Sequence, residues 1–155
     1  MLDEAVFEFS VSGIKTREQA IRYLAEKLEI KGVVKETYLS NVLSREIIFP
    51  TGLQFEGYGV ALPHTDTEHV NKSQIAVLTL EEPVNFIQMA TTDIVVPVKT
   101  IFMLAIKEAH TQVELLQQLV TLLQNREMME QIERLTNTPE SKQELLALLN
   151  SQGIY

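Results

Sequence analysis

The chain has 155 residues, which is the size of a single domain. Its hydrophobic and charged fractions, 45% and 22%, match globular averages and exclude a disordered or fibrous chain. With 13 basic and 21 acidic residues the net charge is −8, which disfavours nucleic acid and anionic membranes, because both attract basic surfaces. An acidic surface does suit docking to a basic protein partner.

Export signals and membrane spans are not expected. The chain has no cysteine, which excludes disulfides, thiolate nucleophiles and Cys-ligated zinc and is typical of a reducing cytosol. The acidic start at residues 1–4 is unlike a secretory signal. The longest apolar stretch, residues 94–106, is interrupted by Pro97 and Lys99 and is shorter than the ~20 residues of a membrane span. We therefore expect a cytoplasmic protein.

Two helices are predicted in the first third of the chain. The first covers about residues 16–31, where Thr16 and Gln19 form a capping box. Apolar residues follow at helical spacing, and Gly32 stands where a helix ends with glycine. The second helix covers about residues 37–46.

Strands are predicted between residues 49 and 106. Four runs are rich in β-branched and aromatic residues and are bounded by turn residues: 57–62, 74–80, 84–87 and 97–106. The end of the last run, residues 101–106, has almost no polar alternation, which is typical of a strand covered by helices on both faces.

Two more helices are predicted after the strands. Thr111 and Glu114 form a capping box that opens a long helix with an apolar stripe. Thr138 and Pro139 start the last helix, with Pro139 at its first position. Helices before and after the strands predict an α/β fold with a mixed β-sheet and helices on both faces, a single three-layer domain over residues 1–155. The last helix could instead be an appendage used in dimer contacts.

His64 stands in the most unusual local sequence, Gly-Tyr-Gly-Val-Ala-Leu-Pro-His-Thr-Asp over residues 57–66. Pro63 restricts its own backbone and that of the residue before it, so the chain leaves the strand in a defined direction. We therefore expect His64 at the rim of the sheet, where α/β proteins place their ligands. A neutral imidazole is a good nucleophile, which makes His64 the candidate for covalent catalysis. The alternative is a surface histidine without a function.

Other residues could hold an anion near His64. Arg45 has a guanidinium that matches phosphate oxygens, and Thr51 adds a hydroxyl. The start of the long helix at Thr111 and Gln112 offers free N–H groups to an anion. The simpler interpretations are a helix-end cation for Arg45 and an ordinary capping box for the helix.

A metal site at this loop is a second alternative. Asp66, Glu68 and His69 follow His64 closely and are metal-binding residue types. Their spacing matches no rigid ligand pair, and a polar loop is the simpler interpretation. We expect no metal.

Taken together, these residues resemble the enzyme IIA domain of the fructose–mannitol class of the bacterial phosphoenolpyruvate-dependent sugar phosphotransferase system (the PTS EIIA type-2 domain). The resemblance rests on Arg45-Glu46, on the Pro-Thr-Gly of residues 50–52 and on the Gly-Val-Ala-Leu-Pro run that ends at His64. It extends over about residues 16–149. It implies that His64 carries the phosphoryl group on Nε2 and that Arg45 assists phosphate binding.

One position departs from the family pattern. Many members have a second histidine at the head of the long helix, before Leu-x-x-Leu-Leu-x-x-Leu. Gln112 stands in that place here, and His110 lies two residues earlier. Either Gln112 donates a hydrogen bond in its stead, or His110 reaches in from the loop. The glutamine, the short chain and the Phe-Pro-Thr-Gly-Leu of residues 49–53 look most like the galactitol-specific branch.

The resemblance implies a phosphocarrier. His64 would accept a phosphoryl group from phospho-HPr and pass it to an enzyme IIB, which serves the membrane enzyme IIC, for uptake of a sugar alcohol such as galactitol. Phosphoryl transfer needs positioning and positive or N–H donors, so no metal or organic cofactor is called for. We also expect a carbonyl or carboxylate to hold the other ring nitrogen of His64. Two alternatives are a regulatory IIA-like domain, which binds target proteins according to its phosphorylation state, and an anion-binding domain without turnover.

Overall fold

A single mixed sheet forms the centre of the molecule in the computed structural model, which describes residues 1–155. Its strands are β1 (Phe7–Val11), β2 (Gly52–Phe55), β3 (Tyr58–Ala61), β4 (Gln74–Ile87) and β5 (Val95–Ala105). They lie in the order β1-β4-β5-β3-β2. β1 runs parallel to β4 and β3 parallel to β5, whereas the β4–β5 and β2–β3 pairs are antiparallel.

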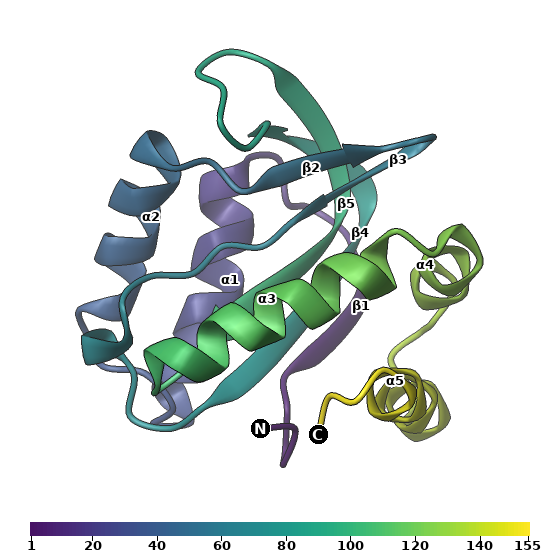
Figure 1. The fold of residues 1–155 in the computed structure, drawn as a ribbon. Helices are drawn as coiled ribbons and strands as arrows, with labels where there is room; N and C mark the ends of the chain where they lie inside the picture. The colour runs from purple at the N-terminus through teal and green to yellow at the C-terminus, as the bar shows by residue number, and fades with distance from the viewer.

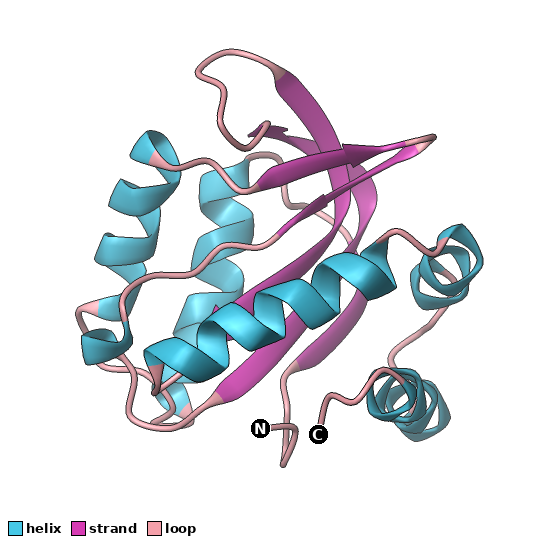
Figure 2. Cartoon of the chain, viewed as in Figure 1, coloured by secondary structure: helices cyan, strands magenta, loops and turns pink.

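Helices cover both faces of this sheet (Figures 1 and 2). One face carries α1 (Arg17–Ile30) and α2 (Tyr38–Ile48). The other carries α3 (Ala109–Leu123), α4 (Arg126–Glu133) and α5 (Pro139–Ser151). A short 3-10 turn, η1 (Thr67–His69), connects β3 to β4. The predicted α/β fold with a mixed sheet between helices is confirmed. No helix is long and apolar enough to cross a membrane.

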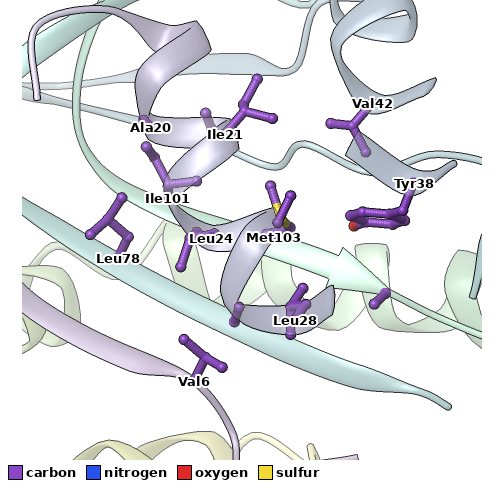
Figure 3. Packing of buried hydrophobic residues seen from close by; sticks show 14 of the residues in the cluster. Val6, Ala20, Ile21, Leu24, Leu28, Tyr38, Val42, Leu78, Ile101 and Met103 are labelled. Atoms are coloured by element: carbon purple, nitrogen blue, oxygen red, sulfur yellow. The ribbon is translucent and has the colours of Figure 1, made fainter. Parts of the chain in front are cut away.

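The alternation of side chains along β5 divides the interior into two cores. Ile101, Met103 and Ala105 face α1 and α2, where they join a cluster of 23 buried residues (Figure 3). Phe102 and Leu104 point the opposite way and join a cluster of 20 buried residues under α3, α4 and α5. Every side chain of residues 101–106 is fully buried. The run without polar alternation is therefore a strand with both faces covered, as predicted.

The predicted helix signals are confirmed at three helix ends and wrong at a fourth. Thr16 Oγ1 accepts the N–H of Gln19 at 3.1 Å at the start of α1, and Gly32, with φ +74°, follows its end. Thr138 caps α5 in the same manner as Thr16 caps α1. α3, however, begins at Ala109, two residues before the predicted capping box, and has no side-chain cap. The segment that follows β5 is short, so the helix starts as soon as the chain has turned.

Two strands and one helix were not predicted, and one strand was predicted as two separate runs. All three are short: β1 pairs with the distant β4, β2 forms a hairpin with the neighbouring β3, and α4 packs into the second core. The predicted runs 74–80 and 84–87 are one strand, β4, with an irregularity between Thr79 and Val84. α5 buries Leu145 and Leu149 in the second core, so it belongs to the domain and is not an appendage.

The topology collects four chain segments at one edge of the sheet. β3 and β5 are parallel, so the segments after them leave at the same edge. β2 is antiparallel to β3, and its first residue, Gly52, pairs with the last residue of β3, Ala61. The end of α2 therefore meets the end of β3. Arg45 and Thr51, His64 and the start of α3 all belong to segments at this edge.

Candidate active site

His64 lies three residues beyond the end of β3, in a segment that continues along β5. It forms an isolated parallel bridge with Leu104, and the Leu104 N–H donates to the Pro63 carbonyl at 3.1 Å. The Tyr38 hydroxyl in turn donates to the Leu104 carbonyl at 2.7 Å. Pro63 is buried, whereas His64 is only half-buried. The backbone that carries the imidazole is thus fixed, and part of the ring remains accessible.

The hydrogen bond of the His64 ring identifies its tautomer. Nδ1 lies 2.7 Å from the carbonyl oxygen of Leu62. A carbonyl only accepts, so Nδ1 carries the proton and Nε2 of the neutral ring keeps its lone pair. Nε2 makes no hydrogen bond within the protein. The ring therefore presents Nε2 as a nucleophile.

The surroundings of His64 favour the neutral ring. Burial lowers the pKa of His64 from its ordinary value of 6.5, and the positive charge of Arg45 lowers it further. The hydrogen bond to Leu62 and the negative charge of Asp66 act in the opposite direction but do not cancel the decrease of the pKa. A pKa below 6.5 leaves the imidazole uncharged at neutral pH.

Arg45 supplies positive charge near His64. Its Nη1 lies 3.5 Å from Oδ1 of Asp66, a weak and largely exposed contact. Its guanidinium carbon lies 5.1 Å from the centre of the Phe49 ring, which supports it through a cation–π contact. A third of the Arg45 side chain remains exposed. The guanidinium can therefore exchange the distant Asp66 oxygen for an anion.

Contrary to the expectation from the sequence, Thr51 does not offer its hydroxyl to an anion. The residue is buried, and its hydroxyl lies 3.1 Å and 3.0 Å from the two carboxylate oxygens of Glu46. The same hydroxyl oxygen accepts the N–H of Leu62 at 3.2 Å. The hydroxyl that the sequence offered to a phosphate is therefore engaged inside the protein. Sequence reasoning missed the role of Glu46, although Glu46 is part of the motif with Arg45.

The two candidates at the start of α3 have different surroundings. His110 is 85% exposed and its Nε2 lies 2.9 Å from Oε1 of Glu114, one turn along the helix. Gln112 has a buried amide oxygen without a partner, and its amide nitrogen makes no protein hydrogen bond. The main-chain N–H of Gln112 donates to the Glu108 carbonyl at 3.0 Å and is not free for an anion. The free N–H groups of this helix belong to residues 109–111.

The polar loop after His64 is a structural element. His69 Nδ1 lies 2.8 Å from the hydroxyl of Thr37, and the Lys35 N–H donates to the His69 carbonyl at 2.9 Å. These contacts attach η1 to the segment before α2. No group of three or more His, Asp or Glu side chains could hold a metal ion.

Exposed apolar side chains adjoin the site, and these side chains were not predicted from the sequence. Ile47, Ile48 and Phe49 at the end of α2 are 78%, 69% and 59% exposed. Ile48 and Phe49 line a shallow hollow of about 390 Å³ together with Met89 of the β4–β5 loop. Phe49 is also the ring that supports Arg45. An apolar surface therefore begins beside the guanidinium.

The fold and the site together define a class of protein. Residues 1–152 match the family model "Phosphoenolpyruvate-dependent sugar phosphotransferase system, EIIA 2". The chain belongs to this family and is an EIIA component, a phosphotransferase of the sugar phosphotransferase system. The family's activity is phosphoryl transfer to an enzyme IIB for sugar uptake.

Particular relatives give a finer comparison. The galactitol-specific EIIA component of Escherichia coli K12 is 31% identical over 136 residues, which cover 86% of this chain and 88% of that protein. The crystal structure of mannitol IIA from Escherichia coli covers 92% of this chain and 94% of its own, with a TM-score of 0.72 and 23% identity. Mannitol enzyme IIA in its complex with phosphorylated enzyme IIB, also from Escherichia coli, covers 94% of each chain with a TM-score of 0.71 and 25% identity.

Proposed function

We propose that His64 accepts a phosphoryl group from phospho-HPr and passes it to an enzyme IIB that serves the uptake of a sugar alcohol, galactitol. The observation that supports this most is the tautomer of His64. The Leu62 carbonyl holds the proton on Nδ1 at 2.7 Å, so the lone pair of Nε2 is available at neutral pH. We also propose that the exchange takes place in the cytoplasm, which the absence of cysteine supports.

The reaction is an exchange of one N–P bond for another. The lone pair of His64 Nε2 forms a bond to phosphorus while the bond to the histidine of the donor breaks, and that histidine keeps the electron pair. In the second half, a nucleophile of enzyme IIB attacks the same phosphorus and His64 Nε2 leaves as the neutral ring. No net proton transfer from His64 is needed, because Nδ1–H stays on the Leu62 carbonyl throughout.

Arg45 is the group that we assign to the phosphoryl oxygens. The transition state of phosphoryl transfer spreads negative charge over the equatorial oxygens. A guanidinium with planar N–H donors stabilises that charge by hydrogen bonds and by Coulomb attraction. The weak contact with Asp66, 3.5 Å long, offers little competition to a phosphoryl group.

Both partners in this proposal are proteins, and the surface near His64 supports that. The exposed Ile47, Ile48 and Phe49 offer apolar area beside Arg45. The net charge of −8 suits a donor with a basic face. The relative with 31% identity is galactitol-specific, and this similarity supports galactitol over mannitol as the sugar alcohol.

The test of the phosphoryl acceptor is transfer from labelled phosphoenolpyruvate through enzyme I and HPr. We expect one phosphate per chain, in a bond that is labile to acid and stable to base, as expected for phosphohistidine. The His64→Ala variant should carry no label, whereas His69→Ala and His110→Ala, which remove the other two histidines, should keep it. Label on the His64→Ala protein would overturn the assignment.

The test of the acceptor protein is transfer from the phosphorylated chain to a panel of purified enzymes IIB. We expect the fastest discharge with a galactitol-specific IIB and slower discharge with mannitol-specific and fructose-specific IIB proteins. A chain that is labelled on His64 but discharges to none of them would contradict the transport role and support the regulatory alternative.

A further inference from the structure

We propose that Glu46 and Thr51 are positioning residues that hold the His64 ring in its reactive tautomer. This inference rests on the proposed function of His64. Neither residue contacts the reacting atoms. They act through the backbone of Leu62, whose two polar groups connect Thr51 to the imidazole.

The connection consists of consecutive hydrogen bonds. The Leu62 carbonyl accepts the Nδ1–H of His64 at 2.7 Å, and the Leu62 N–H donates to the Thr51 hydroxyl at 3.2 Å. Leu62 lies outside β3, so Thr51 takes the place of a ladder partner for its N–H. If the Leu62 peptide rotated, its carbonyl would move away from Nδ1, and the ring would lose the acceptor that fixes the proton there.

Glu46 makes the Thr51 hydroxyl a defined acceptor. The Thr51 hydroxyl donates to the Glu46 carboxylate, so its lone pairs are directed elsewhere, toward the Leu62 N–H. The main-chain N–H of Thr51 also donates to Glu46 Oε1 at 2.9 Å. All three groups are buried from solvent, which excludes water as a competing partner.

The placement of Glu46 next to Arg45 gives the end of α2 two separate tasks. Arg45 points outward to Asp66 and Phe49, whereas Glu46 is 6% exposed and points inward to Thr51. Burial raises the pKa of Glu46 and opposes its charged form, so the buried carboxylate needs hydrogen-bond donors. An ordinary role at a helix end does not explain why this carboxylate is buried. The hydrogen bonds from Thr51 partly compensate for the burial.

The experiment measures the His64 tautomer by 15N NMR and the phosphotransfer rate from HPr in the full-length protein. Wild type should show the Nδ1–H tautomer alone. In Thr51→Val we expect the Nε2–H tautomer to become detectable and the transfer rate to fall about ten-fold, because a misplaced nucleophile loses its near-attack geometry. Thr51→Ser, which keeps the hydroxyl, should restore both. Glu46→Gln provides a second variant and should shift the tautomer in the same direction.

Thr79→Val is the matched control. Thr79 is another buried threonine whose hydroxyl accepts a main-chain N–H, that of Ser10, at 2.8 Å. We expect this change to lower stability while the tautomer and the rate stay as in wild type. An unchanged tautomer in both Thr51→Val and Glu46→Gln would overturn the inference, as would an equal tautomer shift in Thr79→Val. The NMR measurement needs no phosphate. If the variants shift the tautomer as expected but the wild-type protein is never labelled on His64, the proposed function is refuted and the positioning role stands.

Discussion

At the scale of single residues, the site depends on keeping one imidazole neutral beside a cation. Arg45 and burial both disfavour the charged ring of His64, and the Leu62 carbonyl selects which nitrogen carries the remaining proton. The same guanidinium that would receive the phosphoryl oxygens therefore also prepares the nucleophile. A cation performs both tasks only if it is near the ring without being hydrogen-bonded to Nε2.

Replacement of Arg45 by alanine should change two measurements in opposite directions. The pKa of His64, followed by NMR titration, should rise, because a nearby positive charge that disfavours imidazolium is removed. Phosphotransfer from HPr should slow by about 10- to 100-fold, because donors to the phosphoryl oxygens are lost. Arg45→Lys is the control: it keeps the charge, so the pKa should stay near the wild-type value, but it loses the planar donor arrangement and part of the rate. An unchanged rate in Arg45→Ala would remove this residue from the site.

The pH dependence of transfer follows from the same pKa. Only the neutral ring attacks phosphorus, so the rate should fall as the pH decreases through the pKa of His64. That pKa is below 6.5, so the midpoint of the decrease should lie below 6.5, and the rate should be level above it. Single-turnover transfer from HPr, measured between pH 5 and pH 8, checks this; a midpoint above 6.5 would be inconsistent with the environment of His64.

At the scale of elements, the start of α3 separates the two candidates for the family's second histidine. The helix begins at Ala109, so His110 and Gln112 are both in its first turn and point in different directions. His110 turns to Glu114 and to solvent, whereas Gln112 buries its amide oxygen and leaves its amide nitrogen free to donate. Of the two, Gln112 is the one whose side-chain donor is not already paired, so we expect it to be the hydrogen-bond donor.

The two variants at this helix should therefore behave differently. Gln112→Ala should slow phosphotransfer several-fold, because one donor near the reacting group is lost, and His110→Ala should leave the rate within the error of wild type. The comparison is internally controlled, since both residues are in the same turn of α3 and neither substitution adds bulk. A larger loss in His110→Ala than in Gln112→Ala would reverse the assignment.

β3 approaches β5 too closely to accept a side chain at Gly59. A Cβ atom at this position would lie 2.3 Å from the Pro97 carbonyl oxygen and 2.6 Å from Cγ1 of Val96. One of these obstacles is backbone, which cannot rotate away. We expect Gly59→Ala to lower the free energy of unfolding by at least about 2 kcal/mol, measured by urea denaturation. Glu56→Ala, at an exposed position in the same hairpin, should change it by less than about 0.5 kcal/mol.

At the scale of the whole molecule, the sheet and its two cores support the site from behind. Tyr38 connects them directly, because its ring is fully buried in the first core and its hydroxyl donates to Leu104, the residue beside His64. Burial raises the pKa of Tyr38 far above its ordinary value of 10.0. The folded protein therefore holds this phenol in its neutral form.

The stability of the protein should decrease in alkaline solution because of Tyr38. Above pH 10 the unfolded chain releases the phenol proton while the folded chain retains it, so the free energy of unfolding falls with pH by up to about 1.4 kcal/mol per pH unit. Tyr38→Phe should be less stable at pH 7 by about 1–2 kcal/mol, because the bond to the Leu104 carbonyl is lost. Its disadvantage should shrink between pH 9 and pH 11 in urea denaturation, and a constant difference over that range would contradict the argument.

Local chemistry alone was enough to predict several features of this protein. The caps at Thr16 and Thr138 and the glycine at position 32 were predictable because each acts within one or two turns of its own helix. The apolar run 101–106 indicated a strand with both faces covered, because a strand that lacks polar side chains has no face for solvent. The GVALPH motif identified His64 for the same reason: the restriction by Pro63 is local.

Only the tertiary structure decided the neighbours of His64. β1 depends on β4, a strand distant in sequence, and the short β2 forms a hairpin with β3; short segments of this kind carry little propensity of their own. The edge at which β2, β3 and β5 meet brings Arg45 near His64 and commits Thr51 to Glu46 and Leu62 instead of to an anion. Sequence determined which residues could do the chemistry, because reactivity belongs to the side chain. Topology decided what each of them does, because hydrogen bonds between segments depend on how the strands pair.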